Sequence, residues 1–183
     1  MVTTSSLQLT DRNLILTGYI EPNKPRIGRR VAERLRMPFV DIEERIQDRM
    51  GDSIENLRET FGERHLKTVE DELMEEMILH RNSVLRINGS ILAHSDYLER
   101  LQQTGTVICL VARLDAILKK IHLTLGARYH DPAERGFELG ALRREWAIRK
   151  RENIYELNAT DLDEPAMINE IIDLWQVLAI NRS

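Results

Sequence analysis

The sequence contains little that would place the protein outside the cytoplasm. Its single cysteine, Cys109, excludes a disulfide within the chain. No apolar stretch approaches the ~20 residues that a membrane-spanning helix needs. The polar residues 1–10 lack the charged start and hydrophobic centre of a signal peptide. We therefore expect a cytoplasmic protein that does not bind a membrane.

The chain also lacks a strong excess of one charge and any metal-binding pattern. The formal net charge is -4, so no overall basic field indicates nucleic-acid binding. The five histidines fall at no metal-ligand spacing. We expect neither nucleic acid nor a bound metal ion.

The remaining composition is typical of a folded domain. With 183 residues, of which 42% are hydrophobic and 31% charged, the chain is large enough to bury a core without disulfides. We expect a flexible N-terminal arm over residues 1–11 and a single domain over residues 12–183.

Short apolar runs alternate with segments of helical periodicity along the chain. Strands are expected at 14–17, 37–41, 83–87, 106–111 and 155–157. Helical segments separate them, and residues 127–137 are expected to form a mobile loop before a basic helix over 139–154. Strands that alternate with helices predict a parallel sheet covered on both faces.

The segment after the first strand has the frame of a phosphate-binding loop. The pattern requires Gly-x-x-x-x-Gly-Lys-Ser/Thr, and this chain has Gly18, Asn23 in place of the second glycine, Lys24, and Pro25 in place of the hydroxyl residue. Proline supplies neither an N–H to a phosphate nor an oxygen to magnesium. Gly18, Asn23 and Lys24 remain candidates to bind a phosphate or another anion at a helix N-terminus. Lys24 is alternatively an exposed lysine in a decayed loop.

The order of segments and the local sequence resemble the shikimate kinase family over nearly all of residues 12–180. The most specific stretch, residues 28–41, reads Gly-Arg-Arg-Val-Ala-Glu-Arg-Leu-Arg-Met-Pro-Phe-Val-Asp. It is similar to the family's Gly-Arg-x-Leu-Ala-x-x-Leu-x-x-Pro-Phe-x-Asp. The resemblance implies a three-layer α/β/α P-loop fold with a five-stranded parallel sheet, of the nucleoside monophosphate kinase type. It also implies a kinase that uses ATP and magnesium.

Several positions that touch substrate in the family are altered here. The family's Asp-x-Asp is similar to Asp41-Ile42-Glu43, where the second carboxylate is one methylene longer. Lys67 stands where an arginine clamps the substrate carboxylate, and lysine lacks the planar two-pronged hydrogen bond. The family's glycine triplet, which lies against substrate, reads Asn88-Gly89-Ser90. By resemblance, Asp41 would be catalytic in an active enzyme, and Glu43, Lys67 and Gly89 would bind substrate.

Two arginines complete the candidate set. Arg128 occupies the place of the family's lid arginine and would bind phosphate, whereas Arg151, in Arg-x-Asn-x-Tyr, would bind substrate. Structural interpretations remain open for the acid and the lysine. Asp41 also suits the start of a helix, and Lys67 can form an exposed pair with Glu70.

Two main hypotheses follow. In the first, the chain has lost efficient phosphoryl transfer and acts by binding a small anionic metabolite or a protein partner, with no cofactor. In the second, it is an active kinase that uses ATP and magnesium to phosphorylate shikimate or a related small hydroxy acid. There, Lys24, Asp41, Glu43, Lys67 and Arg128 would do the work. A third possibility is a regulatory subunit whose pocket is vestigial.

Overall fold

A computed structural model describes residues 11–18 and 26–181. It has five strands, β1 (Asn13–Gly18), β2 (Phe39–Asp41), β3 (Val84–Arg86), β4 (Gly105–Val111) and β5 (Ile154–Asn158). They form one sheet in the order β2-β3-β1-β4-β5, and every neighbouring pair is parallel. The predicted five-stranded parallel sheet is confirmed. The predicted N-terminal arm lies outside the described residues, apart from Asp11.

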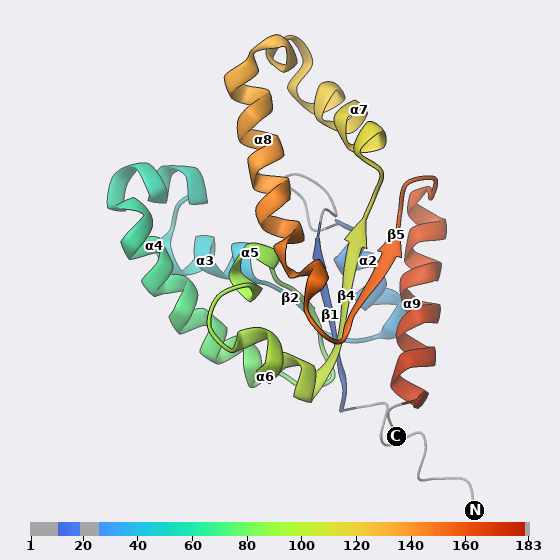
Figure 1. Cartoon of the computed structure of the whole chain (residues 1–183). Coiled ribbons are helices and arrows are strands. Elements are labelled where there is room, and N and C mark those ends of the chain that lie inside the picture. Colours follow the sequence, from blue (N-terminus) through green and yellow to red (C-terminus); the bar gives the residue numbers. More distant parts are fainter. Residues whose placement is uncertain (1–10, 19–25, 182–183) are drawn as a thin grey trace, which may run out of the picture.

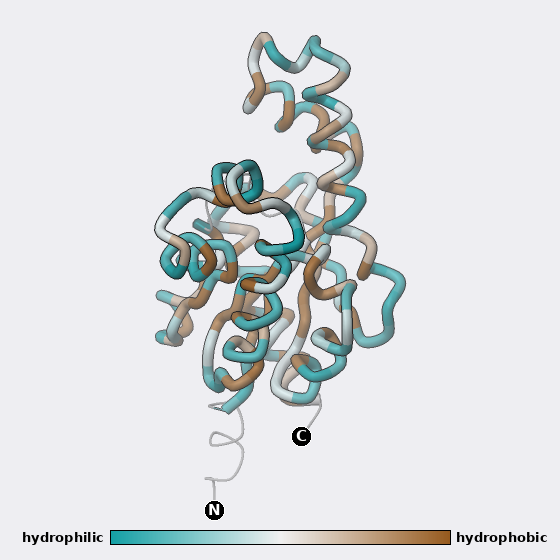
Figure 2. The backbone as a smooth tube through the Cα atoms, turned by 90° about the vertical axis from the view of Figure 1, so that its left-hand side faces the viewer, coloured by the Kyte–Doolittle hydropathy of each residue, from teal (hydrophilic) through white to brown (hydrophobic). Residues whose placement is uncertain are grey.

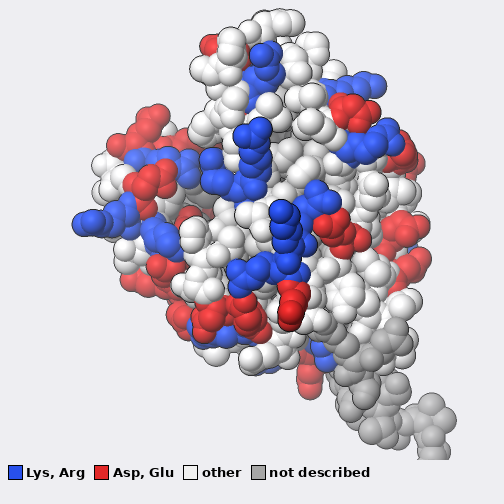
Figure 3. Space-filling model, in the orientation of Figure 1, with Lys and Arg blue, Asp and Glu red and all other residues white. Residues whose placement is uncertain are grey.

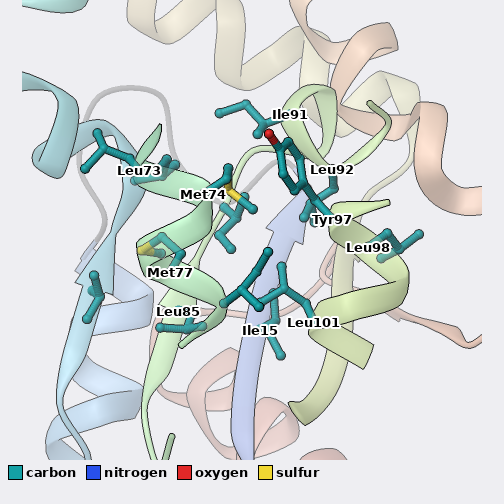
Figure 4. Packing of buried hydrophobic residues seen from close by; sticks show 14 of the residues in the cluster. Ile15, Leu73, Met74, Met77, Leu85, Ile91, Leu92, Tyr97, Leu98 and Leu101 are labelled. Carbon is teal, nitrogen blue, oxygen red and sulfur yellow. The ribbon is translucent and has the colours of Figure 1, made fainter. Parts of the chain in front are cut away.

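Helices cover both faces of this sheet, so the fold has three layers (Figure 1). One face carries α2 (Arg26–Leu35) and α9 (Glu164–Asn181). The other carries α3 (Ile42–Met50), α4 (Ile54–Ile78), α5 (Gly89–Leu92) and α6 (Tyr97–Thr104). Because strand side chains alternate between faces, Leu14 and Leu16 pack in the α2/α9 layer while Ile15 packs in the opposite one. Figure 4 shows this second layer, where α4 methionines and α6 leucines cover Ile15 and Leu85.

The third part of the structure projects beyond the carboxyl ends of the strands (Figures 1 and 2). We call this part, which is distinct from the N-terminal segment, the arm. It consists of α7 (Leu114–Leu125), the 3-10 helix η1 (Gly126–His130), α8 (Pro132–Glu145) and the 3-10 helix η2 (Trp146–Lys150). A small apolar cluster of its own, built on Ile117, Ile121, Leu125 and Leu142, holds α7 against α8.

Two boundaries in the arm differ from the sequence-based expectation. Residues 127–137 are mostly helical rather than a loop, because Asp131 caps α8 by accepting a hydrogen bond from the Ala133 N–H, and Pro132 occupies the first helical turn. The expected helix over 139–154 ends at Glu145, passes through η2 and gives way to β5 at Ile154. The short helix α5 was not predicted.

Local sequence signals explain where α3 and α4 begin and end. Asp41 begins α3, and Gly51, with φ of 76°, ends it in the left-handed conformation. Ser53 begins α4, which bends at Gly62, where φ is 81° and ψ is 166°. None of the described helices is both long enough and apolar enough to cross a membrane.

Candidate functional site

A buried ion pair joins the ends of two adjacent strands. Asp41 ends β2 and lies beside Arg86, the last residue of β3, in the strand register. The Asp41 Oδ1 accepts a hydrogen bond from the Glu44 N–H at 2.9 Å, and its Oδ2 lies 2.7 Å from Nη1 of Arg86. Their side chains are 1% and 12% exposed, respectively. Both carboxylate oxygens of Asp41 are therefore already engaged.

The same guanidinium also contacts Glu43. Nη1 of Arg86 lies 3.3 Å from Oε2 of Glu43, and the Asn88 amide donates to Oε1 of Glu43 at 2.7 Å. Burial lowers the pKa of Arg86, but the adjacent carboxylates of Asp41 and Glu43 outweigh it and hold that pKa above its ordinary value. The group thus keeps its positive charge in the interior.

A second carboxylate, that of Glu145, sits on the start of α5. Its Oε2 accepts a hydrogen bond from the Gly89 N–H at 2.8 Å, and its Oε1 accepts one from the Ser90 hydroxyl at 3.2 Å. Burial raises the pKa of Glu145, although these hydrogen bonds oppose the shift. A Cβ on Gly89 would lie 2.0 Å from the Glu145 carbonyl oxygen, so only glycine fits there. The group close to Gly89 in this structure is the backbone of α8, and the binding of substrate at Gly89 stays a prediction.

Glu43, Arg86 and Glu145 line one of two adjoining cavities between α4, α5 and α8. The first, of about 490 Å³, includes Lys67 and Glu70 in its lining, whereas the second, of about 530 Å³, includes Glu43, Arg86 and Glu145. Both are lined by Arg58, Ser90, Phe137 and Arg144. We call the pair of cavities the cleft. In Figure 3 basic and acidic side chains lie interspersed on the face beneath the arm.

Comparison with known proteins identifies the family. The shikimate kinase family model matches residues 23–173, which is most of the chain. The chain belongs to the shikimate kinase family.

Individual relatives agree with this assignment. The chain is 26% identical to the shikimate kinase of Thermodesulfovibrio yellowstonii over 148 residues, covering 79% of this chain and 81% of that protein. The crystal structure of shikimate kinase from Bacteroides thetaiotaomicron matches with a TM-score of 0.73 at 23% identity, over 91% of this chain and 98% of that one. Shikimate kinase from Acinetobacter baumannii in complex with shikimate matches with a TM-score of 0.70 at 24% identity, over 94% and 97%. The two structural likenesses support the fold.

The structure brings only some of the predicted site residues of this shikimate kinase family member together. Glu43 and Lys67 line the cleft. Gly89 and Asp41 do not line it themselves, but each contacts a residue that does: the Gly89 N–H donates to Glu145, and Asp41 pairs with Arg86. Lys67 is also tied locally, because its Nζ lies 3.0 Å from Oδ1 of Asp71 one helical turn away. Lys67 thus forms an exposed helical ion pair, but with Asp71 rather than with Glu70, the partner expected from the sequence.

The two predicted arginines lie elsewhere. Arg151 forms an ion pair with Glu99 and lines a different cavity, near α6. Arg128 is exposed in η1, at the end of the arm, 3.9 Å from Oε2 of Glu134. Neither arginine lines the cleft, so the structure does not bring them to the other candidates.

At the phosphate-loop frame, Gly18 alone is described, and Asn23 and Lys24 lie outside the described residues. Gly18 has φ of 90°, and a Cβ there would lie 2.3 Å from the Leu110 carbonyl oxygen. This position therefore requires glycine. Within residues 11–18 and 26–181, no three or more His, Cys, Asp or Glu side chains gather in a way that could hold a metal ion.

Sequence reasoning missed the residues that organise the cleft. Arg86 carries a signal in hindsight: it is the charged last residue of an apolar strand, and the strand beside it ends in an acid. Glu145 carries no such signal, because its role depends on α8 returning to α5 across 55 residues. Arg58 and Arg144 carry no signal either, because nothing in the neighbouring sequence distinguishes them from other arginines on exposed helix faces.

Proposed function

We propose that this shikimate kinase family member lacks efficient phosphoryl transfer and acts by binding a small carboxylate-bearing ligand in the cleft. The observation that carries the proposal is the position of Asp41. A general base must lie within hydrogen-bond reach of the substrate proton. Here the side chain of Asp41 is only 1% exposed, and each of its oxygens already accepts a hydrogen bond from the protein, one from the Glu44 amide and one from Arg86.

The sequence of the phosphate loop supports the same conclusion. Shikimate kinases ordinarily use ATP and magnesium. At the position of the magnesium-binding hydroxyl this chain has Pro25, which offers neither hydroxyl nor N–H. The donor set does not fit a magnesium–nucleotide complex, and the proposed function includes no cofactor.

The binding role is supported by a cation in the cleft that has no counter-ion within the described part of the chain. Arg144 lines both cavities and has no ion-pair partner among the described residues. Arg58 and Lys67 lie on the same lining, each with one acidic partner. A guanidinium without a counter-ion suits a ligand carboxylate, because the two can form paired hydrogen bonds.

The alternative is an active kinase for shikimate or a related small hydroxy acid. It is favoured by the relatives, which are shikimate kinases, and by Gly18, whose left-handed conformation suits a tight phosphate-binding turn. In this alternative Lys24 and Asp41 would be catalytic. The proposed cytoplasmic location and the absence of nucleic-acid and membrane partners stay predictions under both hypotheses. A protein partner in place of a small ligand also stays open to test.

One experiment separates the two functions. The protein is titrated calorimetrically with Mg-ATP and with shikimate, and ADP formation is followed with both present. Each lost transition-state donor costs about 10²–10³ in kcat, so we expect turnover about 10⁴-fold or more below the 1–100 s⁻¹ typical of kinases. The double variant Asn23→Gly, Pro25→Ser tests the loop: if Asp41 is committed to Arg86, restoring the loop raises nucleotide affinity without restoring ordinary turnover. Turnover near 1 s⁻¹ in the unaltered chain would refute the proposal.

A further inference from the structure

The two cavities of the cleft differ in the sign of their charge. The first cavity, which we call the cationic lobe, is lined by three cations, Arg58, Lys67 and Arg144, against two acids, Glu63 and Glu70. The second, which we call the acidic lobe, is lined by four acids, Glu43, Glu55, Glu138 and Glu145. Its three cations are Arg58, Arg86 and Arg144, of which the first and last are shared with the cationic lobe.

In the acidic lobe most of the positive charge is already neutralised. Arg86 is held by Asp41 and Glu43, and Arg58 is paired with Glu63. Glu55 and Glu138 have no ion-pair partner among the described residues. The charge left for a ligand in this lobe is therefore negative, which disfavours an acidic group and favours a cationic one.

Glu145 adds to the acidic lobe a carboxylate that is held in one orientation. Its two oxygens are held by the Gly89 amide and the Ser90 hydroxyl, and its backbone lies against Gly89. Burial raises the pKa of Glu145 and so weakens its negative charge, as it does at Glu70, but a cation placed beside this carboxylate favours the charged form and meets a side chain that is already ordered.

In the cationic lobe the balance is reversed. Arg144 has no ion-pair partner among the residues that the structure describes, and burial raises the pKa of Glu70 against the opposing effect of Lys67. A raised pKa weakens the negative charge of Glu70 relative to an ordinary glutamate. Because Arg58 and Lys67 are paired with Glu63 and Asp71, the positive charge left for a ligand is that of Arg144, opposed only by the weakened charge of Glu70. Ile91 and the exposed ring of Phe137 supply apolar lining between the charged groups.

We propose that the cleft binds a zwitterion of the amino-acid class, with the ligand carboxylate on Arg144 and its ammonium group in the acidic lobe near Glu138 and Glu145. This inference rests on the proposed binding function and names its ligand class. A ligand with both charges satisfies both lobes, whereas a simple acid satisfies one and is repelled by the other. Two adjoining sites of opposite charge thus favour a zwitterion over a simple acid.

The test is calorimetric titration of the full chain with each of the twenty standard L-amino acids at pH 7.5. The tightest binder is then compared with its deaminated acid and its decarboxylated amine; for phenylalanine these are 3-phenylpropanoate and 2-phenylethylamine. A hydrogen bond to a charged group contributes about 1.5–3 kcal/mol. Each truncated ligand should therefore bind about 10-fold to 100-fold more weakly.

Variants assign the two charges to their lobes. Arg144→Gln should weaken the amino acid and its deaminated acid alike, by about tenfold. Glu138→Gln and Glu145→Gln should weaken the amino acid and leave the deaminated acid unchanged or tighter. Arg143→Gln is the matched control, because Arg143 is an exposed neighbour that lines neither cavity, and it should change no affinity.

The outcomes separate this inference from the proposed function. If the deaminated acid, or shikimate, binds as tightly as the amino acid, the zwitterion is refuted while a carboxylate-binding protein remains. Failure of all twenty amino acids to bind at millimolar concentration also refutes it. Rapid phosphorylation of shikimate would instead overturn the proposed function itself.

Discussion

The two sides of the cleft use charge in different ways. On the inner side, formed by β2, β3 and α5, Asp41 is buried and is paired with Arg86, whose side chain is 12% exposed. On the outer side, formed by α4 and α8, Arg58 and Arg144 are exposed. Buried charges that lose their partner destabilise the fold strongly, whereas exposed ones do not. The inner charges therefore maintain the structure, and the outer charges are those available to a ligand.

The largest expected effect comes from breaking the inner ion pair. Arg86→Ala leaves Asp41 buried without its partner, and we expect a loss of about 3–5 kcal/mol in the free energy of unfolding. Arg113→Ala is the control, because Arg113 pairs with Asp115 and Asp161 in an exposed position, and its loss should change the stability far less than the loss of Arg86. Urea denaturation followed by circular dichroism measures both. Equal losses in the two variants would contradict the structural role of the inner pair.

A smaller effect is expected where α8 touches the inner side. Gly89→Ala places a Cβ 2.0 Å from the Glu145 carbonyl oxygen, so the backbone must shift, at about 1–3 kcal/mol. Gly136→Ala, within α8, meets no atom within 4 Å and should stabilise by roughly 0.5–1 kcal/mol, because alanine is the better helix former. Thermal unfolding distinguishes them. If both alanines raise the melting temperature, α8 does not rest on Gly89 in solution.

The third prediction concerns pH and Glu145. Burial raises the pKa of Glu145, so the folded protein holds this proton more tightly than the unfolded chain does. The stabilisation due to that proton is complete below the ordinary value of 4.5 and is lost as pH rises through the folded pKa. Glu145→Gln removes this loss and keeps an acceptor for the Gly89 N–H. The variant should therefore gain stability relative to the unaltered protein between pH 4.5 and pH 8, measured by urea denaturation at both values.

Glu145→Ala is the control for this pH effect. It removes the acceptor as well as the charge and leaves the Gly89 N–H without its partner, which costs about 1–3 kcal/mol. It should be less stable than Glu145→Gln at both pH values. A stability difference between Glu145→Gln and the unaltered protein that does not change with pH would show that this carboxyl is not buried in solution.

The fold was predictable from the sequence because its signals are local. Apolar runs such as residues 106–111, helical periodicity in residues 26–35 and the cap residue Ser53 each depend on near neighbours in the chain. The family resemblance added the three-layer P-loop fold with a five-stranded parallel sheet, and the observed sheet confirms it. The start of α8 was missed although its signal, Asp131 followed by Pro132, is local as well.

The cleft was predictable only in part. Glu43 and Lys67 were identified by position in the family pattern, and both line the cleft. Arg151 was identified in the same way but pairs with Glu99 near α6. The position of a side chain after a long helix depends on where that helix ends, and the sequence placed the end of α8 nine residues too late, at 154 rather than Glu145.

The sequence alone determined the parallel three-layer fold and the family, and it has Pro25 where the phosphate-loop pattern has a hydroxyl residue. These follow from residue types and from spacings of a few positions, which chain connectivity preserves in any arrangement. Only the tertiary structure decided that Arg86 forms ion pairs with Asp41 and Glu43, and that Glu145 accepts a hydrogen bond from the Gly89 N–H. The partners in these contacts are 43 to 56 residues apart, so their meeting depends on the packing of whole elements rather than on any local pattern.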